Sequence, residues 1–240
     1  MNDMIYPKTS DVLLIIPAYN EEGNIIRTIE ELEKDFSGYD YLVINDGSQD
    51  MTGEICRSRG YRHISMPVNI GLAGTFRTGM KYADRCGYKF ALQYDGDGQH
   101  LPQYISQMLA EMQKKNGDIV IGSRFLGKKP DITLRGLGSR MIQGLIKMTT
   151  GMTITDPTSG MRMYNRRMIR LFANDINLPP EPDAIALLIR KGYKICEVSV
   201  EMRERQAGQS YLNPGSVISY MVNMCVSIVF IQWFRRDRKK

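Results

Sequence analysis

Two aspartates that directly follow an apolar run are the clearest chemical feature of the sequence. The segment FALQYDGDGQH, residues 90–100, passes from mostly apolar positions into Asp95 and Asp97, with Gln99 close behind. Mg²⁺ and Mn²⁺ prefer oxygen ligands of this kind, and a site with few protein ligands keeps positions open for phosphate oxygens. A metal ion that bridges two phosphates neutralises the charge that develops on a leaving diphosphate. The segment therefore predicts a Mg²⁺ or Mn²⁺ site made by Asp95 and Asp97, with Gln99 as a third ligand.

Other interpretations of this segment assign it a different metal or no function. A calcium loop of the EF-hand type requires glycine at its sixth position and glutamate at its twelfth. This sequence has His100 and Ser106 there, which excludes that loop. A turn rich in aspartate and glycine at a strand end needs no chemical role, and this alternative stays open. For His100 we expect a structural role, as a hydrogen-bond donor that holds the aspartate loop.

The elements that must position these residues follow an alternating pattern. Nearly continuous apolar runs that end in polar or small residues, as buried parallel strands do, occupy residues 12–19, 41–48, 90–97 and 118–125. Between them, residues 21–36 and 102–117 carry apolar side chains on one helical face. The pattern predicts an α/β fold with a mostly parallel sheet and helices on both faces. Ligands bind such sheets at the carboxyl ends of the strands, so the polar clusters there should form one site.

Composition excludes several classes of protein. The 240 residues suffice for one well-cored domain, and 42% hydrophobic with 24% charged residues is ordinary for a globular protein. The four cysteines are far apart and the chain has only two histidines, which argues against a thiolate zinc site and a secreted disulfide scaffold. The first ten residues lack the pattern of a signal peptide, so we expect the bulk of the chain in the cytoplasm.

The C-terminal region differs from the rest of the chain. Residues 217–234 carry no formal charge, and as a helix they would reach ~27 Å against a hydrocarbon thickness of ~30 Å. Residues 235–240, RRDRKK, have five positive charges and one negative, a net of +4, which suits an anionic membrane surface better than a nucleic acid. We therefore divide the chain into a domain at 1–213 and an apolar helix with a basic tail at 214–240. The helix is predicted to contact the membrane, with burial in the core as the alternative.

Within this helix, Ser219, Asn223 and Ser227 recur every four residues and form a narrow polar stripe. A polar stripe is poorly placed against lipid tails. We expect it to face a second copy of the chain or a small membrane-protein partner.

Six segments together carry a resemblance to a known family. They are PAYNEEGN, INDGSQDMT, YDGDGQH, IGSRF, DPTSGMRMYNRR and RERQAGQS. Their order and approximate spacing resemble family 2 glycosyltransferases with the GT-A fold, in the polyprenyl-phosphate branch that includes dolichol-phosphate mannosyltransferase. The resemblance covers about residues 11–212. It implies an inverting, metal-dependent enzyme that takes a sugar from a nucleotide-diphosphate sugar.

The resemblance also implies roles for individual residues. Those carried over to the nucleotide sugar are Pro17, Tyr19 and Glu21 in the nucleoside pocket, Ile44 and Asp46 beside the base and ribose, Asp95, Gly96 and Asp97 in the metal-binding motif, and Arg124 and Arg205 near the diphosphate. Those carried over to the transfer are Asp97, Arg135 at the acceptor lipid phosphate, Asp156 facing the sugar, and Asp183 or Glu181 as a general base. Arg124, Arg135, Arg162, Arg203 and Arg205 all lie beside glycines, serines or strand ends, where a guanidinium can meet phosphate oxygens.

Some residues depart from the family pattern. Asn45 stands at the first acidic place of the usual DDGS, which leaves Asp46 to contact the base. Leu72 and Ala73 stand where many relatives have a lysine, which weakens any diphosphate contact there. Pro182 splits the acidic pair of the sugar-acceptor relatives, although a phosphate acceptor, largely ionised near neutral pH, needs no base.

Three hypotheses about function follow. The leading one is an enzyme at the cytoplasmic face of the cell membrane that joins a sugar to undecaprenyl or another polyprenyl phosphate for cell-envelope glycans. The second is transfer to a sugar hydroxyl of a growing polysaccharide. The third is a non-catalytic partner of a membrane complex that binds nucleotide sugars. A nicotinamide dehydrogenase is a poorer interpretation than these three, because no GxGxxG follows the first apolar run.

Overall fold

A seven-stranded sheet forms the centre of the molecule in the computed structural model, which describes residues 6–127, 134–203 and 214–231. The strands are β1 (Val12–Ala18), β2 (Asp40–Asn45), β3 (His63–Ser65), β4 (Phe90–Gln93), β5 (Ile119–Ser123), β6 (Arg162–Asn165) and β7 (Ile195–Ser199). Their order in the sheet is β3-β2-β1-β4-β6-β5-β7. All pairs are parallel except those of β6, which runs antiparallel to β4 and β5. This confirms the predicted α/β fold with a mostly parallel sheet.

The strands form where the sequence has continuous apolar runs because helices cover both of their faces. Every residue of β2 and β5 is buried. β1, β2 and β4 are parallel neighbours, and β5 has the same direction as β4 because both are antiparallel to β6. The carboxyl ends of these four strands therefore lie at one edge of the sheet. The polar residues that follow each apolar run are thus gathered along that edge, as expected.

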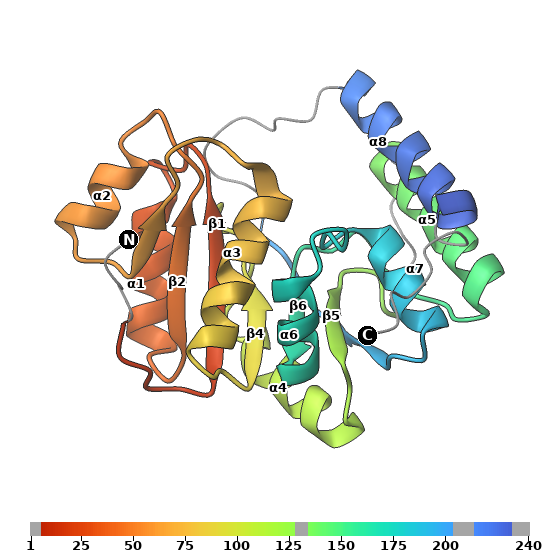
Figure 1. Ribbon diagram of the computed structural model, residues 1–240, viewed down its shortest axis with the longest axis horizontal. Helices are drawn as coiled ribbons and strands as arrows, with labels where there is room; N and C mark the ends of the chain where they lie inside the picture. Colours follow the sequence, from red (N-terminus) through yellow and green to blue (C-terminus); the bar gives the residue numbers. More distant parts are fainter. Residues whose placement is uncertain (1–5, 128–133, 204–213, 232–240) are drawn as a thin grey trace.

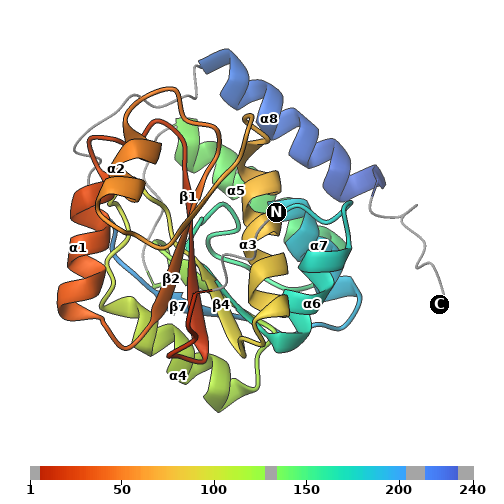
Figure 2. The same cartoon turned by 60° about the vertical axis from the view of Figure 1, so that its left-hand side comes forward.

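Two layers of helices cover the sheet (Figures 1 and 2). The helices are α1 (Ile25–Asp35), α2 (Thr52–Ser58), α3 (Gly71–Arg85), α4 (Tyr104–Lys115), α5 (Leu134–Thr150), α6 (Arg166–Asn174), α7 (Pro182–Arg190) and α8 (Pro214–Val226), which continues as a π-helix over Ser227–Ile231. Residues of α1, α2 and α4 share one core cluster, and residues of α3, α5, α6 and α7 share the other. The predicted helices at 21–36 and 102–117 are confirmed as α1 and α4.

The C-terminal helix lies beside α5 and also contacts α7 through its last turn (Figures 1 and 2). Ile228 is fully buried in the core, and Met221 packs against Gly138 of α5 so closely that a Cβ on this glycine would lie 2.3 Å from Met221 Cε. The opposite face carries Val222 and Phe230, which are 54% and 61% exposed. The helix is thus a core element on one side and an apolar surface on the other.

Two findings bear on the expectations for this helix. Among the residues that the structure describes, no helix has both the length and the apolar character needed to cross a membrane. The polar stripe is also interrupted, because Ser219 and Asn223 are exposed whereas Ser227 is buried and donates to Asp183 Oδ2 at 2.6 Å. The prediction that the whole stripe faces a partner is wrong, since Ser227 bonds within the chain.

Candidate functional site

The aspartate loop after β4 is held by a buried histidine. His100 Nδ1 accepts a hydrogen bond of 3.0 Å from the backbone N–H of Asp95, and the Tyr94 hydroxyl donates to the His100 carbonyl at 2.7 Å. Gly98 has a φ of 72°, in the left-handed region that favours glycine. The expected structural role of His100 is confirmed: Nδ1 accepts from the backbone of the loop, and Nε2 lies 3.4 Å from Asp95 Oδ2.

The same loop is tied to the chain that follows β7. Arg203 N–H donates to the Gln99 carbonyl at 2.9 Å, and Gln99 Nε2 donates back to the Arg203 carbonyl. Within the loop, Asp97 Oδ1 accepts from the Gln99 N–H at 3.1 Å. The two aspartates therefore belong to a loop whose backbone is fixed on both sides, which limits how far their carboxylates can move.

The Asp95 carboxylate lies against a glycine of the neighbouring loop. A Cβ on Gly160 would lie 2.6 Å from Asp95 Oδ2, so only glycine leaves room for the carboxylate there. The described residues contain no group of three or more His, Cys, Asp or Glu that could hold a metal. Two carboxylates only two residues apart, Asp95 and Asp97, suit an ion that takes most of its ligands from phosphate and water, as Mg²⁺ commonly does. The Gln99 backbone carbonyl accepts from the Arg203 N–H, and the side-chain oxygen of Gln99 is the candidate third ligand.

A cavity of 330 Å³ opens beside this carboxylate. It is lined by Leu72, Gln93, Asp95, Gln99, Arg124, Ser139, Thr158, Ser159, Gly160, Arg162, Pro180, Glu181, Met202, Tyr220 and Met221. The lining comes from strands β4 and β6, from the loops at the carboxyl edge of the sheet, and from helices α3, α5 and α8. The cavity thus joins the predicted metal ligands to the C-terminal helix.

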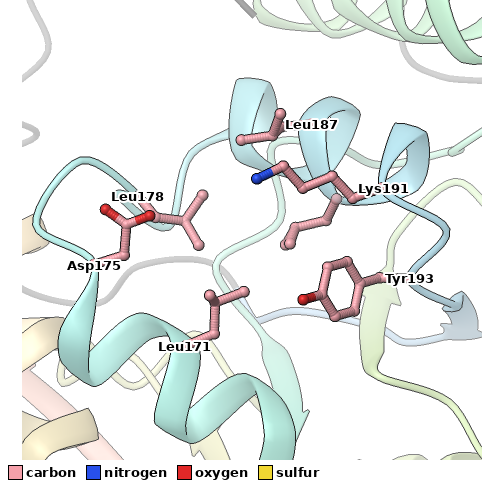
Figure 3. Close-up of a pocket in the computed structure, with 7 residues that line it drawn as sticks. Leu171, Asp175, Leu178, Leu187, Lys191 and Tyr193 are labelled. Atoms are coloured by element: carbon pink, nitrogen blue, oxygen red, sulfur yellow. The ribbon is translucent and has the colours of Figure 1, made fainter. Parts of the chain in front are cut away.

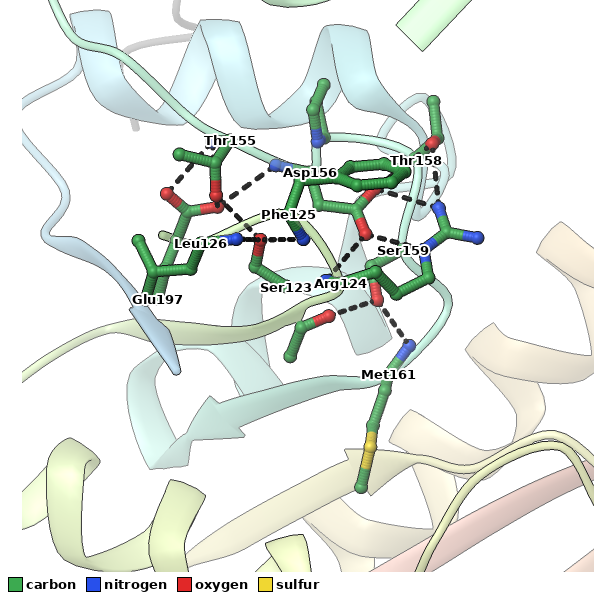
Figure 4. A network of polar contacts seen from close by, with 12 residues as sticks. Ser123, Arg124, Phe125, Leu126, Thr155, Asp156, Thr158, Ser159, Met161 and Glu197 are labelled. Atoms are coloured by element: carbon green, nitrogen blue, oxygen red, sulfur yellow. Dashed lines mark hydrogen bonds and ion pairs between the residues drawn. The ribbon is translucent and has the colours of Figure 1, made fainter. Parts of the chain in front are cut away.

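Arg124 enters this cavity from the end of β5, held by a buried carboxylate (Figure 4). Asp156 is 0% exposed and accepts from Arg124 Nε at 2.7 Å, from Nη2 at 2.8 Å and from its backbone N–H at 3.1 Å. These hydrogen bonds from the guanidinium to Asp156 raise the pKa of Arg124. Asp156 therefore orients Arg124. The prediction that Asp156 faces the sugar is wrong, since its carboxylate is buried behind the guanidinium.

A second carboxylate supports this pair from the other side (Figure 4). Glu197 of β7 accepts from the Thr155 N–H at 2.8 Å, from the Thr155 hydroxyl at 2.8 Å and from the Asp156 N–H at 3.1 Å. Thr155 Oγ1 also lies 2.6 Å from Ser123 Oγ of β5. The position of the Arg124 guanidinium is therefore determined by a network that spans two neighbouring strands.

The other described arginines that were predicted to contact phosphate bind protein groups instead. Arg162 is buried and donates to three backbone carbonyls, so it fixes the loops around the cavity and does not offer a free fork to phosphate. Arg203 makes a bidentate ion pair with Glu31 of α1, at 2.7 and 2.6 Å, which corrects the expectation of a phosphate contact. Arg205 and the side chain of Arg135 lie outside the described residues, although α5 includes the backbone of Arg135.

The predicted nucleoside side lies between the ends of β1 and β2. Asp46 accepts from the N–H groups of Ile70 and Gly71 at 2.8 and 2.9 Å, and so bonds the start of α3. Glu21 is buried and accepts from Asn24 Nδ2 at the start of α1. Ile44 is fully buried in the core, so the prediction that it lies beside the base is wrong.

Pro17 and Tyr19 stand at the end of β1 as predicted. A Cβ on Gly96 would lie 3.0 Å from the Pro17 carbonyl, so this edge approaches the aspartate loop closely. Tyr19 is half-buried. Pro17 and Tyr19 therefore lie at the same edge of the sheet as the aspartate loop.

The PEPD segment separates its two acids. Glu181 lines the cavity and accepts a hydrogen bond from the Tyr220 hydroxyl of α8. Asp183 is buried, does not line the cavity and accepts from Ser227. The structure therefore corrects the prediction for Asp183 as a base: of these two acids, Glu181 is the one that borders the cavity.

A second cavity, of 310 Å³, lies between α6 and α7 (Figure 3). Its lining is Leu171, Asp175, Leu178, Leu187, Leu188, Lys191 and Tyr193. None of these residues lines the first cavity. No predicted site residue that the structure describes lines this second cavity.

Sequence reasoning missed several residues of the first cavity and its support, among them Gln93, Glu197 and Tyr220. Gln93 is a polar residue within a predicted buried strand, which was a signal that the sequence did offer. Glu197 and Tyr220 act through contacts with residues 42 and 39 positions away, which spacing along the chain does not reveal.

Comparison with known proteins places this geometry in a family. The family model described as "Glycosyl transferase family 2" matches residues 13–172. The chain is 30% identical over 225 residues to the "Undecaprenyl-phosphate mannosyltransferase" of Micrococcus luteus, covering 89% of this chain and 92% of the relative. It is 30% identical to the "Dolichyl-phosphate hexose transferase" of Haloferax volcanii, covering 85% and 87%.

Solved structures support the fold. Glucosyl-3-phosphoglycerate synthase from Mycobacterium tuberculosis, solved in complex with Mn²⁺, UDP-glucose and phosphoglyceric acid, superposes with a TM-score of 0.67 at 16% identity. The match covers 95% of this chain and 81% of that one. At this identity the likeness establishes a common fold.

Proposed function

The chain belongs to glycosyl transferase family 2, and we propose that it transfers a sugar from a nucleotide-diphosphate sugar to a polyprenyl phosphate, undecaprenyl phosphate in particular. The observation that carries this proposal is that Asp95 and a pre-oriented Arg124 line the same cavity. A cation at the carboxylate and a guanidinium in the same cavity suit a departing diphosphate. Relatives named as polyprenyl-phosphate transferases support the acceptor.

On the donor side, Asp95 and Asp97 would hold Mg²⁺ or Mn²⁺, which supplies neutralising charge to the leaving diphosphate. Arg124 binds and orients the same diphosphate, because its position is already determined by Asp156 and costs no reorganisation during the reaction. Pro17, Tyr19 and the other predicted nucleotide residues at this edge would bind the nucleoside.

On the acceptor side, a lipid phosphate is already largely ionised at neutral pH, since its second pKa is about 6. It can therefore attack the sugar without a general base, with inversion of configuration at the reacting carbon. Arg135 is the proposed partner of the acceptor phosphate; its backbone lies in the first turn of α5, and Ser139 of the same helix lines the cavity.

The surface of α5 and α8 supports a location at the cytoplasmic face of the membrane. Exposed apolar residues of these two neighbouring helices are Met141, Met148, Val222, Val226 and Phe230, and exposed Arg140 and Lys147 lie on α5. Apolar side chains flanked by cations are typical of helices that lie in the interface of an anionic bilayer. Such a position would keep the cavity close to a lipid acceptor.

The test is transfer by the purified full-length chain. It is incubated with Mn²⁺, labelled UDP- and GDP-sugars in turn, and undecaprenyl phosphate in detergent, with EDTA and Arg124→Ala as controls. We expect a labelled lipid product with at least one donor, and its loss in both controls. Donor binding without any lipid product from the whole panel would contradict the proposal.

Transfer to a sugar hydroxyl remains a second candidate because Glu181 borders the cavity and a hydroxyl acceptor needs a base. The two candidate functions predict opposite effects of substitutions at Arg135 and Glu181 on activity. If the acceptor is a phosphate, Arg135→Ala loses far more activity than Glu181→Gln. If the acceptor is a hydroxyl, Glu181→Gln is inactive with an oligosaccharide acceptor, and undecaprenyl phosphate gives no product.

A further inference from the structure

An unsatisfied buried amide lines the cavity. Gln93, the last residue of β4, is 3% exposed, and its Oε1 has no hydrogen-bond partner among the residues that the structure describes. A buried acceptor that is left unpaired has lost its hydrogen bonds to water without replacement, which destabilises the folded chain. An unpaired group of this kind in a folded protein therefore calls for a ligand or a bound water.

The neighbours of Gln93 do not supply the missing donor. Arg162 stands directly opposite it in the antiparallel β4–β6 ladder, so both side chains lie on the same face of the sheet. The Arg162 guanidinium donates through Nε, Nη1 and Nη2 to the carbonyls of residues 159, 180 and 157, and none of its nitrogens bonds Gln93 Oε1. Ile15, the register partner on the other side, is apolar. The partner of this amide must therefore come from outside the ladder.

The position of Gln93 indicates which ligand group reaches it. It lines the same cavity as Asp95 and Arg124, where the diphosphate is proposed to bind, and as Glu181 on the α7 side. The group attached to the diphosphate, and next to it in the cavity, is the sugar. A carboxamide offers one acceptor and two donors, and rotation of its terminal bond exchanges their places, which suits a sugar hydroxyl.

From these observations we infer that Gln93 is a specificity-determining residue that hydrogen-bonds a hydroxyl of the transferred sugar. The inference rests on the proposed function, since it takes the ligand to be a nucleotide sugar. The first cavity is then divided into a diphosphate side, at Asp95 and Arg124, and a sugar side, at Gln93. Selection among donors arises at the sugar side.

The experiment compares wild type with Gln93→Met, which keeps the length of the side chain and removes its polar atoms. Gln113→Met, the same exchange on the exposed face of α4, is the control. Binding of the preferred nucleotide sugar, of its 3-, 4- and 6-deoxy analogues, and of the free nucleoside diphosphate is measured by calorimetry with Mn²⁺. Transfer kinetics with the same donors provide the second measurement.

We expect Gln93→Met to bind the parent nucleotide sugar about tenfold more weakly, with unchanged affinity for the nucleoside diphosphate. One deoxy analogue should bind wild type about as weakly as the parent nucleotide sugar binds Gln93→Met. The same analogue and the parent should bind Gln93→Met with equal affinity. Equal discrimination among the analogues by wild type and Gln93→Met would overturn the inference, and would indicate a structural water at the amide. Because binding is measured without an acceptor, failure of lipid transfer would contradict the proposed function alone.

Discussion

Replacing Asp156 by Asn tests whether the buried carboxylate orients Arg124. The side chain of Asp156 is fully buried, and that of Arg124 is 26% exposed. Removing one partner of a fully buried ion pair costs about 3–5 kcal/mol. Since the guanidinium keeps partial access to water and Asn keeps one acceptor, we expect a loss of about 2 kcal/mol. For a domain of this size that lowers Tm by about 4–8 °C.

The effect on activity should exceed the effect on stability. A guanidinium that is no longer held toward the diphosphate loses pre-organisation, and we expect kcat/KM to fall about 100-fold. The control is Glu54→Gln, which removes an ion pair with Arg57 of the same 2.7 Å length but with both side chains more than half exposed. Exposed pairs contribute about 0–1 kcal/mol, so this variant should be nearly normal. Equal Tm values and equal kcat/KM for Asp156→Asn and wild type, measured by calorimetry and steady-state transfer, would refute the argument.

Three further predictions concern the metal, the effect of pH and the C-terminal helix. Asp97→Ala should lower kcat by orders of magnitude at any Mn²⁺ concentration with little change in Tm; full activity in the presence of EDTA would contradict this. Burial opposes ionisation of Asp40, but hydrogen bonds from Thr9–Ser10 outweigh it and hold the pKa of Asp40 below its usual value. The stabilisation that ionised Asp40 contributes is therefore present above pH ~4 and is lost as pH falls through the lowered pKa. Asp40→Asn should lower Tm at pH 7, and its Tm should converge with that of wild type in acid. A Tm difference that stays constant down to pH ~2 would oppose this. Phe230→Glu should weaken binding to anionic vesicles at constant Tm, whereas Ile228→Ala should cost about 2–5 kcal/mol of stability; the reverse pattern would mean that the exposed and buried faces of the helix are misassigned.

The parts of the site that follow directly from strand ends were predictable from the sequence. Asp95 and Asp97 follow an apolar run, and parallel strands must deliver such residues to one edge of the sheet. The pairing of Arg124 with Asp156 was not predictable, because it joins positions 32 residues apart through loops whose paths depend on the antiparallel strand β6. A periodicity of apolar residues specifies which face of an element is buried, but not which polar side chain lies opposite.

For Ile44, the sequence suggested a binding role that the structure does not support. Its place beside a functional motif suggested a binding role, yet in a strand successive side chains point to opposite faces of the sheet. Ile44 therefore enters the core while Asn45, the next residue, points to the other side and bonds Ser48 and Ser65. Carrying a family role to a residue requires its side-chain direction as well as its position in the motif.

The C-terminal helix shows why two sequence interpretations that looked exclusive are both needed. A segment without charges predicts that all sides of the helix have apolar surroundings, but it does not indicate whether protein or lipid provides them. In the structure, Met221 and Ile228 pack on the domain while Val222 and Phe230 remain exposed, so different faces satisfy the two interpretations. Because Tyr220 and Met221 also line the cavity, the helix that is proposed to meet the membrane is a wall of the site. Removing residues 214–240 would therefore open the cavity and expose core side chains, and activity on water-soluble acceptors should fall along with activity on lipid.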